Sequence, residues 1–248
     1  MTIGTAQELT YLKEIGRIVA IIIKEMGKAL KPGITTGELD AIGEKLLNQL
    51  GARSAPKVTY DFPGFTCISI NEEAAHGVPG DRIINAGDVV NIDVSAEKHG
   101  YFADSGHTFL VAPINPGNNR LCQYTQQALA SAMEVARAGK PLNLIGKRIT
   151  QVARRAGYNT LKDLGSHGIG LSLHDEPQFI ANFYDSRDKR VLQEGQVITI
   201  EPFLSTKAQL TFLGDDGWTL LTPKGNRSAQ FEHTMVITKD KPIILTAA

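Results

Sequence analysis

The stretch VVNIDVSAEKHGYFADSGHTFL, residues 89–110, carries two aspartates on apolar runs that are joined by a turn-like EKHG segment. This pattern predicts an antiparallel hairpin. If the hairpin folds symmetrically about Lys98 and His99, Asp93 lies directly opposite Asp104, although a bulge would shift the register. Like charges on directly opposed strand positions are destabilising, so something is expected to compensate them. The alternative is that one of the two aspartates lies on a solvated edge.

Three more side chains stand in similar surroundings. His167 lies in SHGIG, Glu201 in VITIEPF and Glu232 in AQFEHTMVIT, next to glycines or apolar strand-like sequence. A carboxylate among apolar residues is costly to bury unless its charge is compensated. Together with the two aspartates they give four carboxylates and one imidazole, whose four negative charges two divalent cations would neutralise. The set therefore predicts a two-metal hydrolase site.

Composition narrows the class of protein. The chain has 248 residues, 26 of them basic and 26 acidic, so its net charge is zero. No basic excess indicates nucleic-acid binding, and no polybasic or membrane-spanning segment indicates a membrane. Two cysteines, Cys67 and Cys122, make neither a disulfide framework nor a C-x-x-C zinc signature. We expect a soluble, cytoplasmic protein without a targeting segment, and a monomer by default.

The helix signals occur twice along the chain. Capping-box patterns at Thr5 and Thr35 open two helices, and a second pair of helices starts near Asn119. Strand-like segments with the acidic residues follow each pair. This predicts an α+β fold of two related halves, about residues 1–112 and 113–248, in a single catalytic domain with the site between the halves. Two helix pairs also arise by chance in α+β proteins, so the duplication is a hypothesis.

Five segments, taken in order, carry a family resemblance. They are residues 71–80 (NEEAAHGVPG), 89–111 around the aspartate pair, 166–178 (SHGIGLSLHDEPQ), 197–202 (VITIEP) and 216–238 (DGWTLLT through SAQFEHTMVIT). In this order and spacing the chain resembles type I methionine aminopeptidases over nearly its whole length. The resemblance implies the pita-bread fold, with two pseudo-twofold-related halves of helices packed on an antiparallel sheet. It also implies removal of the N-terminal methionine from peptides and nascent proteins, preferably before a small second residue.

The resemblance also implies roles for individual residues. The dinuclear metal ligands are Asp93, Asp104, His167, Glu201 and Glu232. The two ions would be Co, Mn, Fe or Zn, and a hydroxide held between them would attack the first peptide carbonyl. Glu201 would also act as general base, His174 would hydrogen-bond the oxyanion and His76 the peptide group beyond the scissile bond. Partners would be a peptide or nascent-chain N-terminus and, transiently, the ribosome.

Phe62, Cys67 and Trp218 align with the pocket for the methionine side chain. A thioether makes favourable contacts with aromatic rings, although a lone Phe or Trp on an apolar strand is as often simply core. Cys67 fits a small buried wall residue better than a nucleophile. The remaining histidines are expected outside the site, with His99 solvated in the turn, His107 on the face opposite Asp104, and His233 facing away from Glu232.

Some positions depart from the common family pattern: Thr59 stands where an aromatic residue is expected near the pocket rim, and Ala75, Ser166 and Leu171 also differ. None is a predicted ligand, so they bear on the pocket shape and the second-residue preference. Two other readings stay open. One is a sibling peptidase that cleaves before proline, whose members usually carry an extra N-terminal domain. The other is a catalytically inactive binding module of the same fold, against which the five intact ligand positions argue.

Overall fold

Residues 1–247, described by a computed structural model, contain five helices. They are α1 (Ala6–Ala29), α2 (Thr36–Gln49), α3 (Ala55–Tyr60), α4 (Pro116–Val135) and α5 (Leu144–Ala156). Both predicted capping boxes form: the hydroxyls of Thr5 and Thr35 accept from the backbone N–H three residues on, and the glutamates there return the bond. Because each box satisfies N–H groups that a first helical turn leaves free, the sequence places both helix starts correctly.

Helix α4 begins earlier than predicted. The side chain of Asn115 caps it by accepting from the backbone N–H groups of Gly117 and Asn118, and Pro116 occupies the first turn. Proline suits this position because it lacks the N–H that would stay free and its φ is already helical. The predicted start near Asn119 was therefore wrong by one turn.

The strands of residues 1–247 are short apart from one long hairpin. They are β1 (Arg53–Ser54), β2 (Cys67–Ile70), β3 (Glu73–Ala75), β4 (Val89–Lys98), β5 (Tyr101–Leu110), β6 (Asn159–Thr160), β7 (Gly165–Gly168), β8 (Asp175–Ala181), β9 (Val197–Ile200), β10 (Phe203–Ser205), β11 (Phe212–Leu213), β12 (Leu220–Leu221), β13 (Ser228–Gln230), β14 (His233–Val236) and β15 (Ile243–Ile244). All their pairings are antiparallel. The two largest sheets are β4 with β1, β2 and β5, and the row β15-β14-β9-β7-β8.

The hairpin β4–β5 turns one position later than the symmetric prediction. Lys98 pairs with Tyr101, which leaves His99 and Gly100 as a two-residue loop, and both have positive φ (57° and 82°). Asp93 consequently faces Gly106, and Asp104 faces Ser95. The prediction of directly opposed aspartates was wrong: the two are diagonal neighbours on the same face, still within reach of each other.

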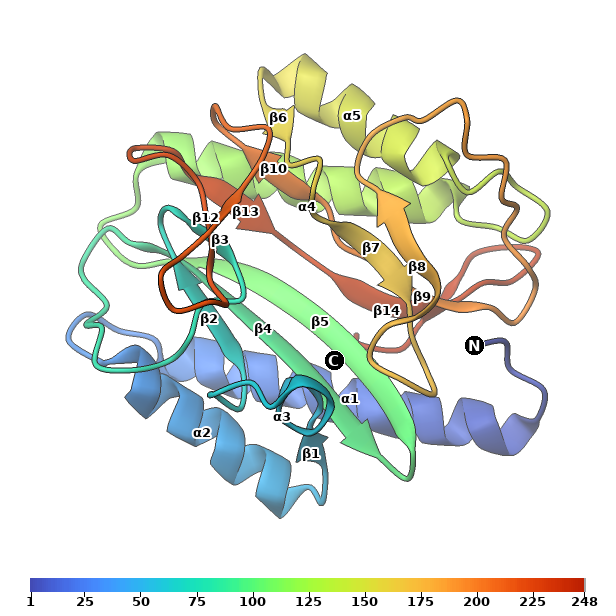
Figure 1. Ribbon diagram of the computed structural model, residues 1–248, viewed down its shortest axis with the longest axis horizontal. Coiled ribbons are helices and arrows are strands. Elements are labelled where there is room, and N and C mark those ends of the chain that lie inside the picture. Colours follow the sequence, from blue (N-terminus) through green and yellow to red (C-terminus); the bar gives the residue numbers. More distant parts are fainter. Residues whose placement is uncertain (248) are drawn as a thin grey trace.

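Each helix pair covers its own group of strands. The side chains of α1 and α2 pack with β2 and β4 in one apolar core, and those of α4 and α5 pack with β9, β10 and β14 in another. Figure 1 shows α1 and α2 along one side of the molecule and α4 and α5 along the other, with the strands of both groups between them. The arrangement agrees with the predicted helix pairs and leaves a zone between the halves where their strands meet.

His107 illustrates the side of β5 that faces the helices. Its ring lies between those of Phe109 and Phe231, with centroids 4.5 Å away in each case. As predicted, it points away from the face that carries Asp104. Burial, together with the neighbouring His233, lowers the pKa of His107 from 6.5 to about 4, so the ring is neutral at pH 7.

Acidification is therefore expected to destabilise the protein through His107. Between pH 6.5 and about 4 the unfolded chain binds this proton and the folded protein does not, so the free energy of unfolding falls as the pH falls. The full shift corresponds to roughly 3 kcal/mol. Urea unfolding of chelator-treated wild type and H107F at pH 7.5 and 4.5 measures it: the wild type should lose about 2–3 kcal/mol more than the variant. Equal losses would contradict the assignment.

Candidate metal centre

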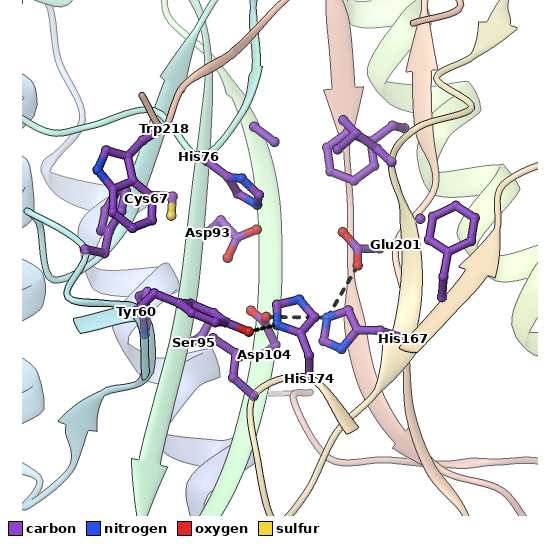
Figure 2. Close-up of a pocket in the computed structure, with 18 of the residues that line it drawn as sticks. Tyr60, Cys67, His76, Asp93, Ser95, Asp104, His167, His174, Glu201 and Trp218 are labelled. Atoms are coloured by element: carbon purple, nitrogen blue, oxygen red, sulfur yellow. Dashed lines mark hydrogen bonds and ion pairs between the residues drawn. The ribbon is translucent and has the colours of Figure 1, made fainter. Parts of the chain in front are cut away.

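The five predicted ligands converge where the two halves meet. Asp93 lies on β4, Asp104 on β5 and His167 on β7, whereas Glu201 directly follows β9 and Glu232 directly precedes β14. Figure 2 shows the carboxylates of Asp93 and Glu201 directed toward the same space, with Asp104 and His167 beside it. Nε2 of His167 is 3.6 Å from Oε1 of Glu201 and 3.9 Å from Oδ2 of Asp104. The structure thus brings together residues that are up to 139 positions apart, a distance no local sequence pattern spans.

Glu201 and Glu232 lie at breaks between strands, whereas the sequence predicted both within strands. The register of β9 with β14 pairs Ile200 with His233, and its continuation sets Glu201 beside Glu232. At these breaks the chain passes from one sheet to another, from β9 to β10 and from β13 to β14. The two side chains can therefore face the zone between the sheets, and neither has to lie on a regular strand face.

Burial dominates the electrostatics of this cluster. The pKa values of Asp93, Glu201 and Glu232 are raised well above their usual range, first by burial and next by the carboxylate of Asp104. Burial also raises the pKa of Asp104 itself. The charge of Asp104 makes ionisation of the other three carboxylates harder, so the cluster favours a positively charged partner.

The hydrogen bonds of His167 test whether a metal ion fits. Its Nδ1 lies 2.9 Å from the carbonyl oxygen of Gly168, and since a carbonyl only accepts, Nδ1 carries the proton. Burial lowers the pKa of His167 to about 4, so Nε2 is an unprotonated lone pair at neutral pH. That lone pair faces the oxygens of Asp104 and Glu201, which are acceptors as well. Acceptors that converge without a donor suit a bound cation.

Two buried carboxylate oxygens agree with this. Oδ1 of Asp104 and Oε1 of Glu232 are buried and have no hydrogen-bond partner among residues 1–247. Ligand atoms of Asp104, His167 and Glu232 lie within 4.8 Å of one another, close enough to share one ion. Since a buried charged oxygen without a partner is costly, the donor set fits a divalent cation.

Gln230 holds two of the carboxylates in place. Its Nε2 donates to Oε2 of Glu232 at 3.0 Å and to Oδ2 of Asp93 at 3.4 Å, while its Oε1 accepts from Asn91 at 2.8 Å. The bond from Asn91 fixes which end of the amide faces the carboxylates. Each carboxylate thereby has one oxygen engaged by the amide. Gln230 was not predicted from the sequence, where its position two residues before Glu232 was the one available signal.

A glycine makes room for this amide. A Cβ added at Gly106 would lie 1.9 Å from Oε1 of Gln230 and 2.4 Å from its Nε2. Gly106 is also the residue that pairs with Asp93 across the hairpin. The shifted hairpin register therefore places Gly106 at the point of β5 that the Gln230 side chain contacts.

His76 and His174 face the cluster from opposite halves of the chain. His76 directly follows β3 with φ at +55°, a left-handed conformation that is strained for a residue with a side chain. The next residue is confined too, because a Cβ at Gly77 would lie 2.2 Å from the carbonyl oxygen of Ile68. The ring of His174 packs against that of His167 at a tilt of 43°, with centroids 4.3 Å apart. Burial within the pocket lowers the pKa of both His76 and His174, so both rings are neutral at pH 7.

A pocket of about 260 Å³ opens beside the cluster. Its wall includes Phe62, Cys67 and Trp218, and the rings of Phe62 and Trp218 meet edge to face with centroids 5.3 Å apart. Cys67 is buried, and burial raises the pKa of its thiol well above the usual range, so the thiol stays protonated at neutral pH. The volume is below the roughly 300–1,000 Å³ of pockets for drug-sized ligands, so it suits a single side chain.

The sequence missed one further residue of the pocket wall, Tyr60. Its hydroxyl lies 2.5 Å from Nδ1 of His174 (Figure 2). The family pattern led us to expect an aromatic residue at position 59, where this chain has Thr59. Tyr60 supplies that aromatic ring one position later, at the end of α3. The signal for Tyr60 in the sequence was that the neighbouring Thr59 departs from the family pattern.

Comparisons with known proteins agree with the geometry. Residues 10–239 match the metallopeptidase family M24. Methionine aminopeptidase 2 of Bacillus subtilis strain 168 is 47% identical over 247 residues, 99% of either chain. The crystal structure of the Thermotoga maritima methionine aminopeptidase superimposes with a TM-score of 0.95 at 31% identity, covering 100% of both chains.

A more distant relative shares the fold of this chain but is a peptidase of another kind. The prolidase from Pyrococcus furiosus matches with a TM-score of 0.79 at 25% identity, and this chain covers 66% of it. The expected pita-bread α+β fold is thereby confirmed, since it is common to both kinds of peptidase. Sequence identity is higher, and coverage complete, toward the aminopeptidases. The chain therefore belongs to the M24 metallopeptidases and, within that family, to the methionine aminopeptidases.

Proposed function

We propose that Asp93, Asp104, His167, Glu201 and Glu232 hold two divalent ions, of Co, Mn, Fe or Zn, which this chain uses to remove N-terminal methionine. The observation that carries the proposal is the lone pair on Nε2 of His167, which faces carboxylate oxygens without a donor between them. Four carboxylates offset the charge of two divalent ions, and the imidazole admits transition metals. When bound, the ions supply Lewis acidity that activates water and polarises the scissile carbonyl.

Glu201 is the proposed proton carrier. Among residues 1–247 its Oε1 accepts a long bond, 3.4 Å, from the Thr199 hydroxyl, so this oxygen is held only weakly by the protein. A carboxylate oxygen beside the attacking water can take its proton and return it to the leaving amine. The same side chain thus serves as ligand and general base.

His174 and His76 act on the substrate. A neutral His174 can donate an N–H hydrogen bond to the carbonyl oxygen as negative charge develops on it, which is the role of an oxyanion-hole donor. His76, held in its strained conformation on the other wall, would donate to the peptide group beyond the scissile bond. Together the two rings orient the first peptide unit between the halves.

The pocket supplies the specificity. The methionine side chain would enter between the rings of Phe62 and Trp218, with Cys67 on the wall, because a thioether makes favourable contacts with aromatic edges. The free α-amino group would lie next to the buried carboxylates, which restricts cleavage to chain ends. A small second residue is preferred in this proposal, since His76 and His174 both occupy space next to the scissile bond.

The cellular setting is part of the proposal. The whole chain would act as one catalytic domain and as a monomer, in the cytoplasm, on peptides and on nascent chains that it meets at the ribosome. No helix of residues 1–247 has the length and apolar character to cross a membrane. A neutral net charge gives no basis for nucleic-acid binding by the chain alone.

Peptide cleavage after metal exchange tests the proposal. Release of methionine from Met-Ala-Ser and Met-Lys-Ser would be measured after chelation and after readdition of Mn, Fe, Co or Zn, with X-Pro dipeptides as controls. We expect activity to vanish on chelation, to return with metal at about two ions per chain, and to favour Met-Ala-Ser. Cleavage of X-Pro substrates alone would assign the chain to the prolidase side of the family. A folded, metal-loaded protein without activity would support a binding module.

A further inference from the structure

Tyr60 and His174 join the two halves of the molecule across the mouth of the pocket. The phenolic oxygen lies 2.5 Å from Nδ1 of His174, and the two rings are inclined at 46° with centroids 5.7 Å apart. Tyr60 ends α3 in the first half, whereas His174 precedes β8 in the second. Figure 2 shows the tyrosine reaching toward His174 in front of Asp104.

The local structure fixes where Tyr60 points. Helix α3 starts at the Ser54 cap, and its first residues, Ala55 and Pro56, are buried. It ends at Asp61, whose φ of +58° turns the chain away in a left-handed conformation, and Phe62 is again buried. Tyr60 is therefore held between two anchored points, while the residue itself is 45% exposed and can contact the opposite wall.

The hydrogen bond decides which nitrogen of His174 carries the proton. A phenol keeps its proton at neutral pH, and within residues 1–247 the only partner of the Tyr60 hydroxyl is Nδ1 of His174. A neutral imidazole has one protonated and one bare nitrogen, so a hydroxyl that donates to Nδ1 leaves the proton on Nε2. Nε2 is then the ring's donor, free to bond a ligand in the pocket that His174 lines.

We infer that Tyr60 is a positioning residue: by donating to Nδ1 it fixes the orientation and the Nε2–H tautomer of His174, so that this ring can donate to the substrate carbonyl. The inference rests on the proposed function of His174. Without the phenol, the ring can rotate and also populate the Nδ1–H form, in which Nε2 is an acceptor and repels a carbonyl oxygen. The cost falls on the step in which charge develops on that oxygen, and substrate binding is little affected.

Nitrogen NMR observes the tautomer directly. The zinc-loaded protein, labelled with ¹⁵N at histidine, would be compared as wild type and Y60F, with H174A identifying the His174 signals. We expect the wild type to show His174 with a protonated Nε2 and a bare Nδ1, and Y60F to show a mixture of the two forms. An unchanged Nε2–H signal in Y60F, or a protonated Nδ1 in the wild type, would overturn the inference.

Kinetics separate this inference from the role of His174. Losing the hydrogen-bond partner that orients a metal-ligating histidine typically costs about 10- to 100-fold, and we expect a loss of similar size for His174. Y60F should lower kcat for Met-Ala-Ser by about tenfold or more with KM within about twofold, and it should cost nothing further in an H174A background. Y184F, a change at an exposed tyrosine outside the pocket, is the matched control. If H174A is fully active, the proposed function of His174 fails; if H174A is impaired while Y60F is not, only the Tyr60 inference fails.

Discussion

An Asp104→Asn protein is expected to lose at least about 10³-fold in kcat/KM for Met-Ala-Ser and yet to be more stable than the wild type when both are metal-free. Asp104 contributes to the raised pKa of Asp93, Glu201 and Glu232, and one of its oxygens is buried without a partner. Removing its charge relieves repulsion in the metal-free protein, but it also removes a ligand. Activity and stability should therefore move in opposite directions.

Two measurements check this expectation. Urea unfolding in the presence of a chelator at pH 7.5 should show a gain of roughly 1–3 kcal/mol for D104N over the wild type. Calorimetric titration with Mn or Co should show weaker binding or fewer ions per chain. D240N, which removes an exposed carboxylate far from the cluster, should change neither quantity. A less stable metal-free D104N would mean that the carboxylate is compensated within the protein itself, contrary to the proposed metal centre.

A His174→Ala protein is expected to lose about 10²- to 10³-fold in kcat while it binds metal as the wild type does. His174 lines the pocket and contacts the His167 ring, but its Nδ1 is engaged by Tyr60 and it is not among the proposed ligands. A donor aimed at the developing oxyanion stabilises the transition state more than the bound substrate. The loss should consequently appear in kcat, with KM little changed.

Single-turnover kinetics with a stoichiometric metal determination would test this. The number of ions per chain should be equal in H174A and the wild type, and H174Q, which retains an N–H donor, should recover part of the rate. Loss of metal from H174A, with a normal rate per bound ion, would make His174 a support of the metal centre instead.

Local signals in the sequence predicted the helix starts, because a capping box is written in four consecutive residues. Thr5 and Thr35 were placed correctly on that basis, whereas the start of α4 depended on Asn115, which lacks the second half of the box. The hairpin turn lies one position later than predicted, which shifts the cross-strand partner of Asp93 by two residues, from Asp104 to Gly106. The observed two-residue loop, His99 and Gly100 with positive φ, and the predicted turn centred on Lys98 and His99 are both compatible with the sequence of this segment. Composition alone does not decide which of the two forms.

The candidate site was predictable as a set of residue types and not as an arrangement. Buried carboxylates are conspicuous in a sequence because apolar strands rarely carry them. Gln230 and Tyr60 are not, since a glutamine or a tyrosine is unremarkable in any strand or helix. Their importance comes from contacts with Glu232 and His174 that only the folded chain brings about.

The contact between Gly106 and Gln230 limits which substitutions the two positions can accept during evolution. Any side chain at position 106 would occupy the space of the glutamine amide, and a shorter residue at position 230 would release Asp93 and Glu232. Neither position can be altered alone without disturbing a carboxylate, although the two are 124 residues apart (230 − 106). The two positions are thus expected to change together in evolution. In a mutational scan, substitutions of Gly106 should be tolerated only when position 230 is changed as well.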